Sequence, residues 1–261
     1  RRTRLRVCVA CIDDAMSANP HLPADAAVAV PVYTLLDPIR TCPHHAMSLV
    51  QVADSHSFGE HYQDYSIAIA DALEDLDSLR SRSIKRPVSE FERYLLGRLG
   101  VELRSLEPLL DTMNISQVMT ICERFGAFHL HGRNALITQL DEPGQHAAAQ
   151  AGFEIMVRGE DGLRDFVTNA YQRAAAEGKA GMSSTIFGRL RTFLTSAEQA
   201  KDFEPIKQIM VDRLSELVPY GPDDPPIFGV RPSHRHWHTL ISAERQYGIP
   251  YRTIKKNVER A

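Results

Sequence analysis

Two stretches, RVCVACIDDAM (6–16) and DPIRTCPHHAM (37–47), decide how we expect the start of this chain to fold. Each contains two metal-binding side chains with two residues between them. This spacing places both side chains on one tight turn, and two such turns can close a tetrahedral zinc site. The predicted ligands of a single Zn²⁺ are Cys8, Cys11, Cys42 and His45.

The choice of ligands leaves some alternatives open. His45 is preferred to His44 because only His45 keeps the two-residue gap, and His56 and His61 are more distant candidates. Two unrelated cysteine turns without a metal would also fit the pattern. Zinc contributes roughly 10–16 kcal/mol to the folding of small zinc peptides, far more than this apolar-poor segment could gain alone. Four protein donors leave no open coordination position, so we expect a structural rather than a catalytic site.

Composition places the chain among ordinary soluble globular proteins, with 43% apolar and 24% charged residues among 261. Four cysteines, three of them near histidines, indicate a metal site in a reducing compartment rather than a disulfide framework. The net charge of −3 combines +4 in residues 1–6, +5 in residues 231–261 and −12 in between. Such basic ends suggest local contacts with anions, although solvated termini are the plain alternative. Because the chain begins with Arg1, we expect it to be a piece of a longer protein.

The fold class predicted from these patterns is mainly α. A small zinc-knuckle, zinc ribbon-like module occupies residues 1–55, and amphipathic helices follow in residues 56–218. The alternating valines of residues 28–32 suggest a short strand in the first module. Cys122 falls on an apolar helical stripe, so we expect it to lie in the core and not to act as a nucleophile. Residues 219–233, rich in proline and glycine, are predicted to form a linker or an extended wrap.

Local signals also mark individual helix boundaries. Ser89 and Glu92 form a capping box, which predicts that a helix begins after Ser89. Near the end of the chain, Gly248 supplies a turn and Pro250 stands where the first turn of a following helix tolerates proline. Residues 234–261 are therefore predicted to form a helix-turn-helix.

The second helix of this terminal unit is strongly cationic. We expect it to bury Ile254 and Val258 and to expose its basic side chains, as a recognition helix for the DNA major groove does. The predicted DNA-binding residues are Arg252, Thr253, Lys255, Lys256 and Arg260. Additional backbone contacts are expected from Arg1, Arg2, Arg4 and Arg6. A basic helical hairpin that packs on the body is the alternative, and metal binding by His234, His236 and His238 is a weaker one.

Taken together, these parts resemble the TniQ family of transposition target-selection proteins. CVAC (8–11) is similar to the first zinc knuckle of that family, and DPIRTCPHHAMSLV (37–50) to the second. Further similarity covers the helices and the terminal helix-turn-helix, in stretches FERYLLGRLG (91–100), GFEIMVRGEDGLRDF (152–166), IFGRLRTFL (186–194) and HTLISAERQYGIPYRTIKKNVERA (238–261). Family members usually have another helical region before the first knuckle, which we expect to lie outside this chain.

The resemblance implies a bacterial, cytoplasmic and nucleoid-associated protein without enzymatic activity of its own. It would hold target DNA for a transposition machine through an AAA+ ATPase or an RNA-guided complex, and it could form a homodimer. A stand-alone transcriptional regulator and a protein-interaction scaffold are the alternatives. A zinc hydrolase or nuclease is disfavoured because the sequence has no HExxH motif, GxSxG elbow or P-loop.

Overall fold

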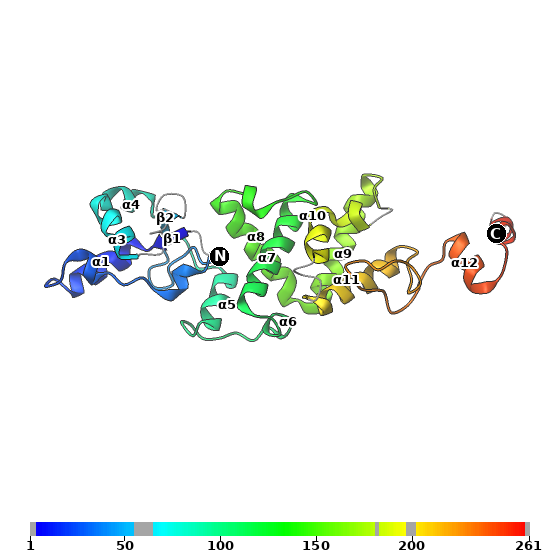
Figure 1. Cartoon of the computed structure of the whole chain (residues 1–261), viewed down its shortest axis with the longest axis horizontal. Coiled ribbons are helices and arrows are strands. Elements are labelled where there is room, and N and C mark those ends of the chain that lie inside the picture. The colour runs from blue at the N-terminus through cyan, green and yellow to red at the C-terminus, as the bar shows by residue number, and fades with distance from the viewer. Residues whose placement is uncertain (1–3, 55–64, 181–182, 197–201, 259–261) are drawn as a thin grey trace.

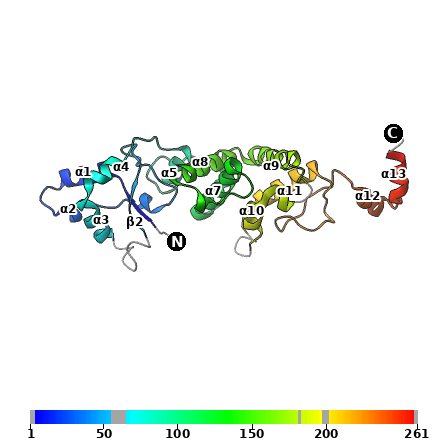
Figure 2. The same ribbon diagram turned by 90° about the horizontal axis from the view of Figure 1, so that it is seen from above.

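Helices follow one another along a single long axis in the computed structural model, which describes residues 4–54, 65–180, 183–196 and 202–258 (Figure 1). The metal-binding turns lie toward one end of this row and a helical hairpin lies at the other (Figure 2). The fold is mainly α, as predicted, with one small two-stranded sheet among the described residues.

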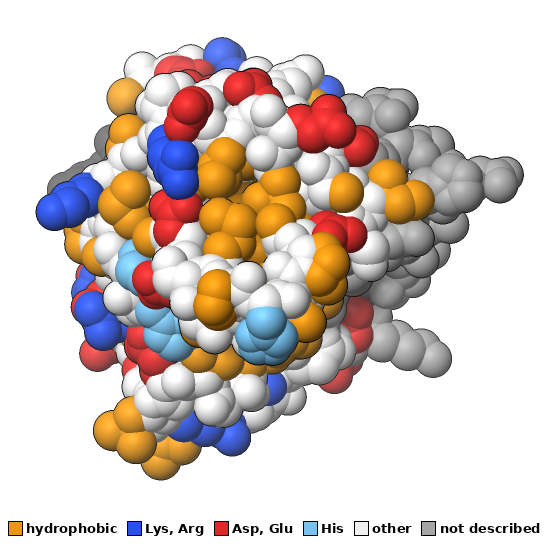
Figure 3. Space-filling view, turned by 90° about the vertical axis from the view of Figure 1, so that its left-hand side faces the viewer, with side chains coloured by type: hydrophobic (Ala, Val, Ile, Leu, Met, Phe, Trp, Pro, Cys, Tyr) orange, Lys and Arg blue, Asp and Glu red, His pale blue; other side chains and the backbone are white. Residues whose placement is uncertain are grey.

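The N-terminal part combines that sheet with short helices. Its elements are β1 (Arg4–Val7), α1 (Val9–Ala18), α2 (Ala24–Ala27), the 3-10 helix η1 (Val32–Leu35), β2 (Val50–Asp54), α3 (Tyr65–Glu74) and α4 (Leu76–Arg82). The two strands are antiparallel, with Val7 opposite Val50. Viewed end-on, this part of the molecule shows apolar side chains in the middle of its face, with acidic, basic and histidine side chains around them (Figure 3).

The strand expected at residues 28–32 is not present. Residues 28–31 form neither helix nor strand, and η1 begins at Val32, which follows Pro31 as its N-terminal cap. Val28 and Val30 instead pack, partly buried, against the small clusters around β1. Their alternation therefore reflects one-sided burial of an irregular segment and not strand pairing.

Helices α3 and α4 belong by packing to the N-terminal part. Ile69 of α3 packs with Val7 and Ile12, while Leu79 of α4 packs with Val50. The boundary predicted after residue 55 falls within residues 55–64, which lie outside the described part of the chain. It remains a prediction, although helices on its C-terminal side pack back onto the sheet.

A longer bundle of helices forms the centre of the molecule. Its elements are α5 (Glu90–Arg98), α6 (Pro108–Asp111), α7 (Ile115–His131), η3 (Ile137–Gln139), α8 (Glu142–Val157), α9 (Gly159–Ala176), α10 (Ser183–Thr195) and α11 (Glu204–Leu217). The capping box at Ser89 is confirmed, because Ser89 accepts from the Glu92 backbone and Glu92 accepts from the Ser89 backbone. Asn114 and Gln117 form a second capping box at the start of α7.

Helices α7 and α8 lie in close contact at two glycines. A Cβ atom added at Gly126 would lie 1.7 Å from the carbonyl oxygen of Ala148, and one at Gly152 would lie 1.8 Å from that of Cys122. Only glycine fits at such a crossing. Cys122 is fully buried there, which confirms its predicted core position.

Residues after α11 wrap over the bundle before the chain leaves it. Tyr220 and Phe228 are buried, and the Phe228 ring lies 5.3 Å from that of Phe187 in α10. The indole of Trp237 donates to the carbonyl oxygen of Glu216, at 2.6 Å. This segment therefore packs on the bundle, and its predicted role between two units remains a prediction.

The C-terminal hairpin consists of α12 (Leu240–Tyr247) and α13 (Tyr251–Val258). Gly248 ends α12 in the left-handed conformation, with φ of 68°, as its position in the sequence suggests. Val258, which we expected to be buried, is 68% exposed, and Ile254 is only partly buried. Among the described helices, α13 packs mainly against α12 and buries none of its residues, so its apolar spacing does not lead to burial.

A membrane-spanning helix would need a long apolar stretch. None of the helices in the described ranges meets that requirement.

Candidate metal centre

The first metal-binding turn forms where β1 runs into α1. Cys8 is the N-terminal cap of α1, and its carbonyl oxygen accepts a hydrogen bond from the Ile12 backbone at 3.2 Å. Cys11 follows in the first turn of that helix. The helical backbone therefore holds both thiols at the end of α1 that lies next to the sheet.

The second turn is a tight reversal held by its own backbone. The Cys42 N–H donates to the Met47 carbonyl at 2.8 Å, and the Ala46 N–H donates to the Cys42 carbonyl at 3.0 Å. Ala46 adopts a positive φ of 49°, which lets the chain reverse within a few residues. Thr41 pairs with Ser48 at the base of the turn. The Cys42 and His45 side chains therefore lie on the same side of this turn.

All four predicted ligands converge. The Sγ atoms of Cys8, Cys11 and Cys42 and the Nδ1 atom of His45 lie within 4.8 Å of one another. His45 Nδ1 lies 3.6, 3.3 and 3.6 Å from the sulfurs of Cys8, Cys11 and Cys42. The Cys11 and Cys42 sulfurs are 3.6 Å apart.

These distances match the edges of a tetrahedral zinc shell. With Zn–S and Zn–N bonds of roughly 2.3 and 2.0 Å, such edges measure about 3.8 Å between sulfurs and about 3.5 Å between sulfur and nitrogen. The donor set can therefore hold a metal ion and is compatible with zinc. Within the described ranges no other group of histidine, cysteine or acidic side chains has this arrangement.

The structure also distinguishes the two neighbouring histidines. His44 is exposed, and its ring lies edge-on to that of Tyr33 at 6.2 Å, whereas His45 turns its ring toward the thiols. The more distant candidates His56 and His61 lie outside the described residues. His234, His236 and His238 join no such group, and His238 instead packs edge-on against Tyr247.

Two residues that the sequence did not single out contact the ligands. His45 Nε2 lies 2.9 Å from the Asp14 carboxylate, which holds the ring with Nδ1 facing the sulfurs. The Tyr33 hydroxyl lies 3.9 Å from the Cys42 sulfur. Asp14 stands three residues after Cys11, so both share one face of α1, and this spacing was a usable signal.

The electrostatics of the thiols favour a bound cation. Hydrogen bonds from the Cys11 and Cys8 thiols lower the pKa of Cys42, while the same contact with Cys42 raises the pKa of Cys11. A contact with Cys42 and a second with Asp14 raise the pKa of His45. A divalent ion would neutralise several thiolates at once.

A buried carboxylate links this centre to the helical bundle. Glu92 of α5 accepts from the backbone N–H of Arg40, two residues before Cys42, at 2.8 Å. It also contacts His146 of α8 at 3.2 Å. Burial alone would raise the pKa of Glu92, but these contacts and the Ser89 backbone lower it to about 2. The second metal-binding turn is thus anchored to α5 and α8.

The predicted DNA-binding residues lie at the opposite end. Arg252, Thr253, Lys255 and Lys256 are exposed on α13, and Arg260 lies outside the described residues. At the N-terminus, Arg1 and Arg2 also lie outside them, and Arg4 is partly buried in β1.

The expectation that Arg6 contacts a DNA backbone is wrong. Arg6 is 3% exposed and forms an ion pair with Asp37 at 3.2 Å, so it is not accessible to a nucleic-acid backbone. Burial, together with the nearby Arg40, lowers the pKa of Arg6. Its side chain serves the packing of β1 rather than an external anion.

We also compared the chain with known proteins. Searches against protein-family models, curated proteins and solved structures find no match to it.

Proposed function

We propose that this protein is a zinc-stabilised DNA-binding adaptor of the TniQ type. In this proposal, the four-ligand centre is structural, α13 contacts DNA and the central helices connect the two. The protein catalyses no reaction itself. Its role in transposition, with an AAA+ ATPase or an RNA-guided complex as partner in a bacterial cytoplasm, rests on the sequence resemblance.

The proposed zinc role is supported by the donor set. Three thiols and one imidazole from the chain itself would complete a tetrahedron around a zinc ion, as in zinc sites that stabilise folds. Catalytic zinc sites instead have three protein ligands and a position for water. The anchoring of the second turn by Glu92 also suits a centre that fixes the orientation of neighbouring helices.

One observation carries the DNA-binding part of the proposal. Helix α13 buries none of its residues and presents Arg252, Thr253, Lys255 and Lys256 at the extremity of the molecule (Figure 1). A short cationic helix after a glycine turn has the form of a major-groove reader. Its position beyond the wrap keeps it clear of the acidic body, which would otherwise repel the phosphates.

Charge reversal in α13 tests this role. The variant Lys255→Glu/Lys256→Glu should weaken binding to double-stranded DNA, measured by fluorescence anisotropy at two salt concentrations. For every phosphate that the variant no longer neutralises, the slope of log affinity against log salt should also become shallower by about one unit. Melting temperature and metal content should stay unchanged, because α13 contributes no buried residue.

The matched control is Lys85→Glu/Lys179→Glu, which changes the net charge equally at exposed positions elsewhere. Unchanged affinity in the α13 variant refutes the proposed contact. An equal loss in both variants also refutes it, because it would reflect general attraction to DNA.

The proposed link to a transposition machine needs a separate test. Pull-down with the candidate AAA+ ATPase, in the presence and absence of DNA, distinguishes an adaptor from a stand-alone regulator. A regulator would bind its DNA site without retaining the ATPase.

A further inference from the structure

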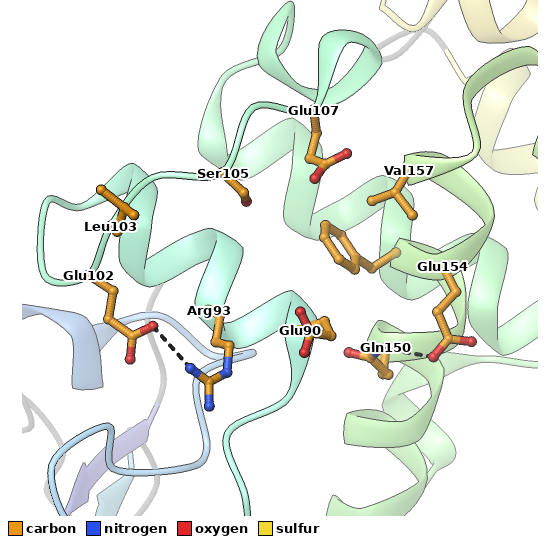
Figure 4. A pocket seen from close by; sticks show the side chains of 10 residues that line it. Glu90, Arg93, Glu102, Leu103, Ser105, Glu107, Gln150, Glu154 and Val157 are labelled. Carbon is orange, nitrogen blue, oxygen red and sulfur yellow. Dashed lines mark hydrogen bonds and ion pairs between the residues drawn. The ribbon is translucent and has the colours of Figure 1, made fainter.

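A cleft with a volume of about 480 Å³ lies between α5, the loop after it and α8 (Figure 4). It belongs neither to the metal centre nor to the C-terminal hairpin. Its lining combines an apolar floor with a row of carboxylates. This combination is the feature from which the inference starts.

The floor of the cleft is rigid. Phe153 of α8 is 5% exposed, and its ring lies 5.5 Å from Phe91 and 5.4 Å from Tyr94, both on α5. Val157, one turn later on α8, is 37% exposed beside it. Because the aromatic rings pack on one another, this apolar surface is held open between the two helices.

The wall formed by the loop after α5 is also fixed in place. A Cβ atom at Gly97 would lie 2.9 Å from the Cα atom of Arg104, so the loop lies directly against α5. Asp111 of α6 holds the same loop through an ion pair with Arg104, at 3.1 Å, and a hydrogen bond from the Glu107 backbone, at 3.1 Å. The cleft is therefore preformed, which lowers the entropic cost of binding.

This fixed loop carries two leucines that face outward. Leu103 is 96% exposed and Leu106 is 76% exposed. Scattered apolar residues are common on surfaces, but Leu103 lines the cleft and extends its apolar surface outward. A bound ligand that covers only the cavity floor would leave Leu103 in water, whereas a peptide segment would cover it.

The rim gives the cleft its charge. Four glutamates and one arginine line it, which leaves a formal charge of −3. Arg93 is the lining cation, and it lies 3.9 Å from Glu102. Burial and the neighbouring Asp111 raise the pKa of Glu107. Figure 4 shows Glu90, Glu107 and Glu154 around the apolar floor, where a cation would meet them.

We propose that this cleft docks a basic amphipathic peptide segment of a partner protein. Apolar side chains of the segment would cover Phe153, Val157 and Leu103, and its lysines or arginines would meet the rim glutamates. Complementary charge and an apolar floor are the features by which grooves select amphipathic helices. This docking is independent of DNA binding by α13.

The direct test uses a fluorescein-labelled amphipathic helical peptide built from leucine, lysine and alanine. We expect it to bind the full-length protein, and the variant Glu90→Lys/Glu154→Lys to weaken that binding by at least about tenfold. The matched control is Asp71→Lys/Glu74→Lys on the exposed face of α3, with the same change in net charge. This control should bind the peptide as the unmodified protein does.

Two further experiments distinguish the contribution of charge to peptide binding from that of apolar contact. The variant Leu103→Ser should also weaken peptide binding, and its melting temperature should stay unchanged because this side chain is 96% exposed. A peptide with glutamate in place of lysine should bind the Glu90→Lys/Glu154→Lys variant better than the unmodified protein.

Several outcomes overturn the proposal. Equal peptide binding by the cleft variant and the α3 control would show non-specific attraction. Spermine that competes as well as the peptide, with no effect of the leucine substitution, would indicate a small cation as ligand. Self-association that disappears in the cleft variant, without any change in peptide binding, would indicate a second copy of this chain.

Discussion

The metal centre and the C-terminal hairpin are both short segments marked by clear local signals, yet they differ in how they are held. At the metal centre, Cys42 is fully buried and Cys8 is 4% exposed, and both belong to the main core cluster. In the hairpin, only Ala243 is buried and α13 buries nothing. A local pattern therefore predicts an element, whereas long-range contacts determine how firmly it is held.

The largest effect should follow from removing a metal ligand. We expect Cys42→Ser to abolish metal binding and to lower the free energy of unfolding by on the order of 5 kcal/mol, part of the roughly 10–16 kcal/mol gained by small zinc peptides. Metal content by plasma emission spectroscopy and a denaturant titration measure the two effects. The control Cys122→Ala removes a buried thiol outside the centre and should retain the metal. Equal metal content in both variants would contradict the assigned ligands.

Acid should weaken the link between the metal-binding turn and the bundle. The pKa of Glu92 falls from 4.5 to about 2 in the folded protein, so its contribution is fully present above pH 4.5 and disappears as pH falls toward 2. A shift of this size corresponds to about 3 kcal/mol. Denaturant titrations between pH 4.5 and 2 should show that the free energy of unfolding decreases. In the Glu92→Gln variant, this dependence on pH should be weaker. A pH dependence that is the same in both proteins would exclude Glu92 as its source.

A smaller effect is expected from the carboxylate behind His45. Asp14→Asn should weaken metal affinity by roughly 10–100-fold, because the imidazole loses the group that orients it. Competition with a chromophoric chelator measures this change. Asp13→Asn is the control, since it removes the same charge from the adjacent position, where Asp13 pairs with Arg80. Identical affinities for both variants would show that Asp14 does not orient the ligand.

The smallest effect should come from the hairpin. Because Val258 is 68% exposed, Val258→Ser should change the free energy of unfolding by less than about 0.5 kcal/mol. Thermal melts followed by circular dichroism check this. Marked destabilisation would mean that Val258 is buried in the folded protein. The hairpin would then not differ from the metal centre in how firmly it is held.

Much of the candidate site could be predicted because its signals are local. A two-residue gap between ligands fixes their separation on one turn, so Cys8, Cys11, Cys42 and His45 could be chosen, and His44 set aside, before any coordinates. The capping box at Ser89 and the turn at Gly248 depend on neighbouring residues in the same way. Metal identity and DNA contact remain predictions.

Other features could not be predicted because they depend on distant residues. Pairing of β1 with β2 joins segments more than forty residues apart. The valines of residues 28–32 alternate as a strand would, but no neighbouring strand in the described part of the chain pairs with them. Val258 has the spacing of a core residue, yet α13 packs mainly against α12 and leaves Val258 68% exposed. The sequence suggests that Arg6 is an exposed cation, but in the fold its side chain forms an ion pair with Asp37.

Residue order and spacing alone establish a mainly helical chain, two ligand pairs, several helix starts and a basic terminal helix, since each depends on contacts within a few residues. Three-dimensional packing had to supply the rest: the burial of Cys8 and Cys42, the Glu92 contact that anchors the second metal-binding turn and the acidic cleft between α5 and α8. These features form where segments distant in the sequence come into contact. The burial and the local charge at such places depend on both segments, so neither segment predicts them alone.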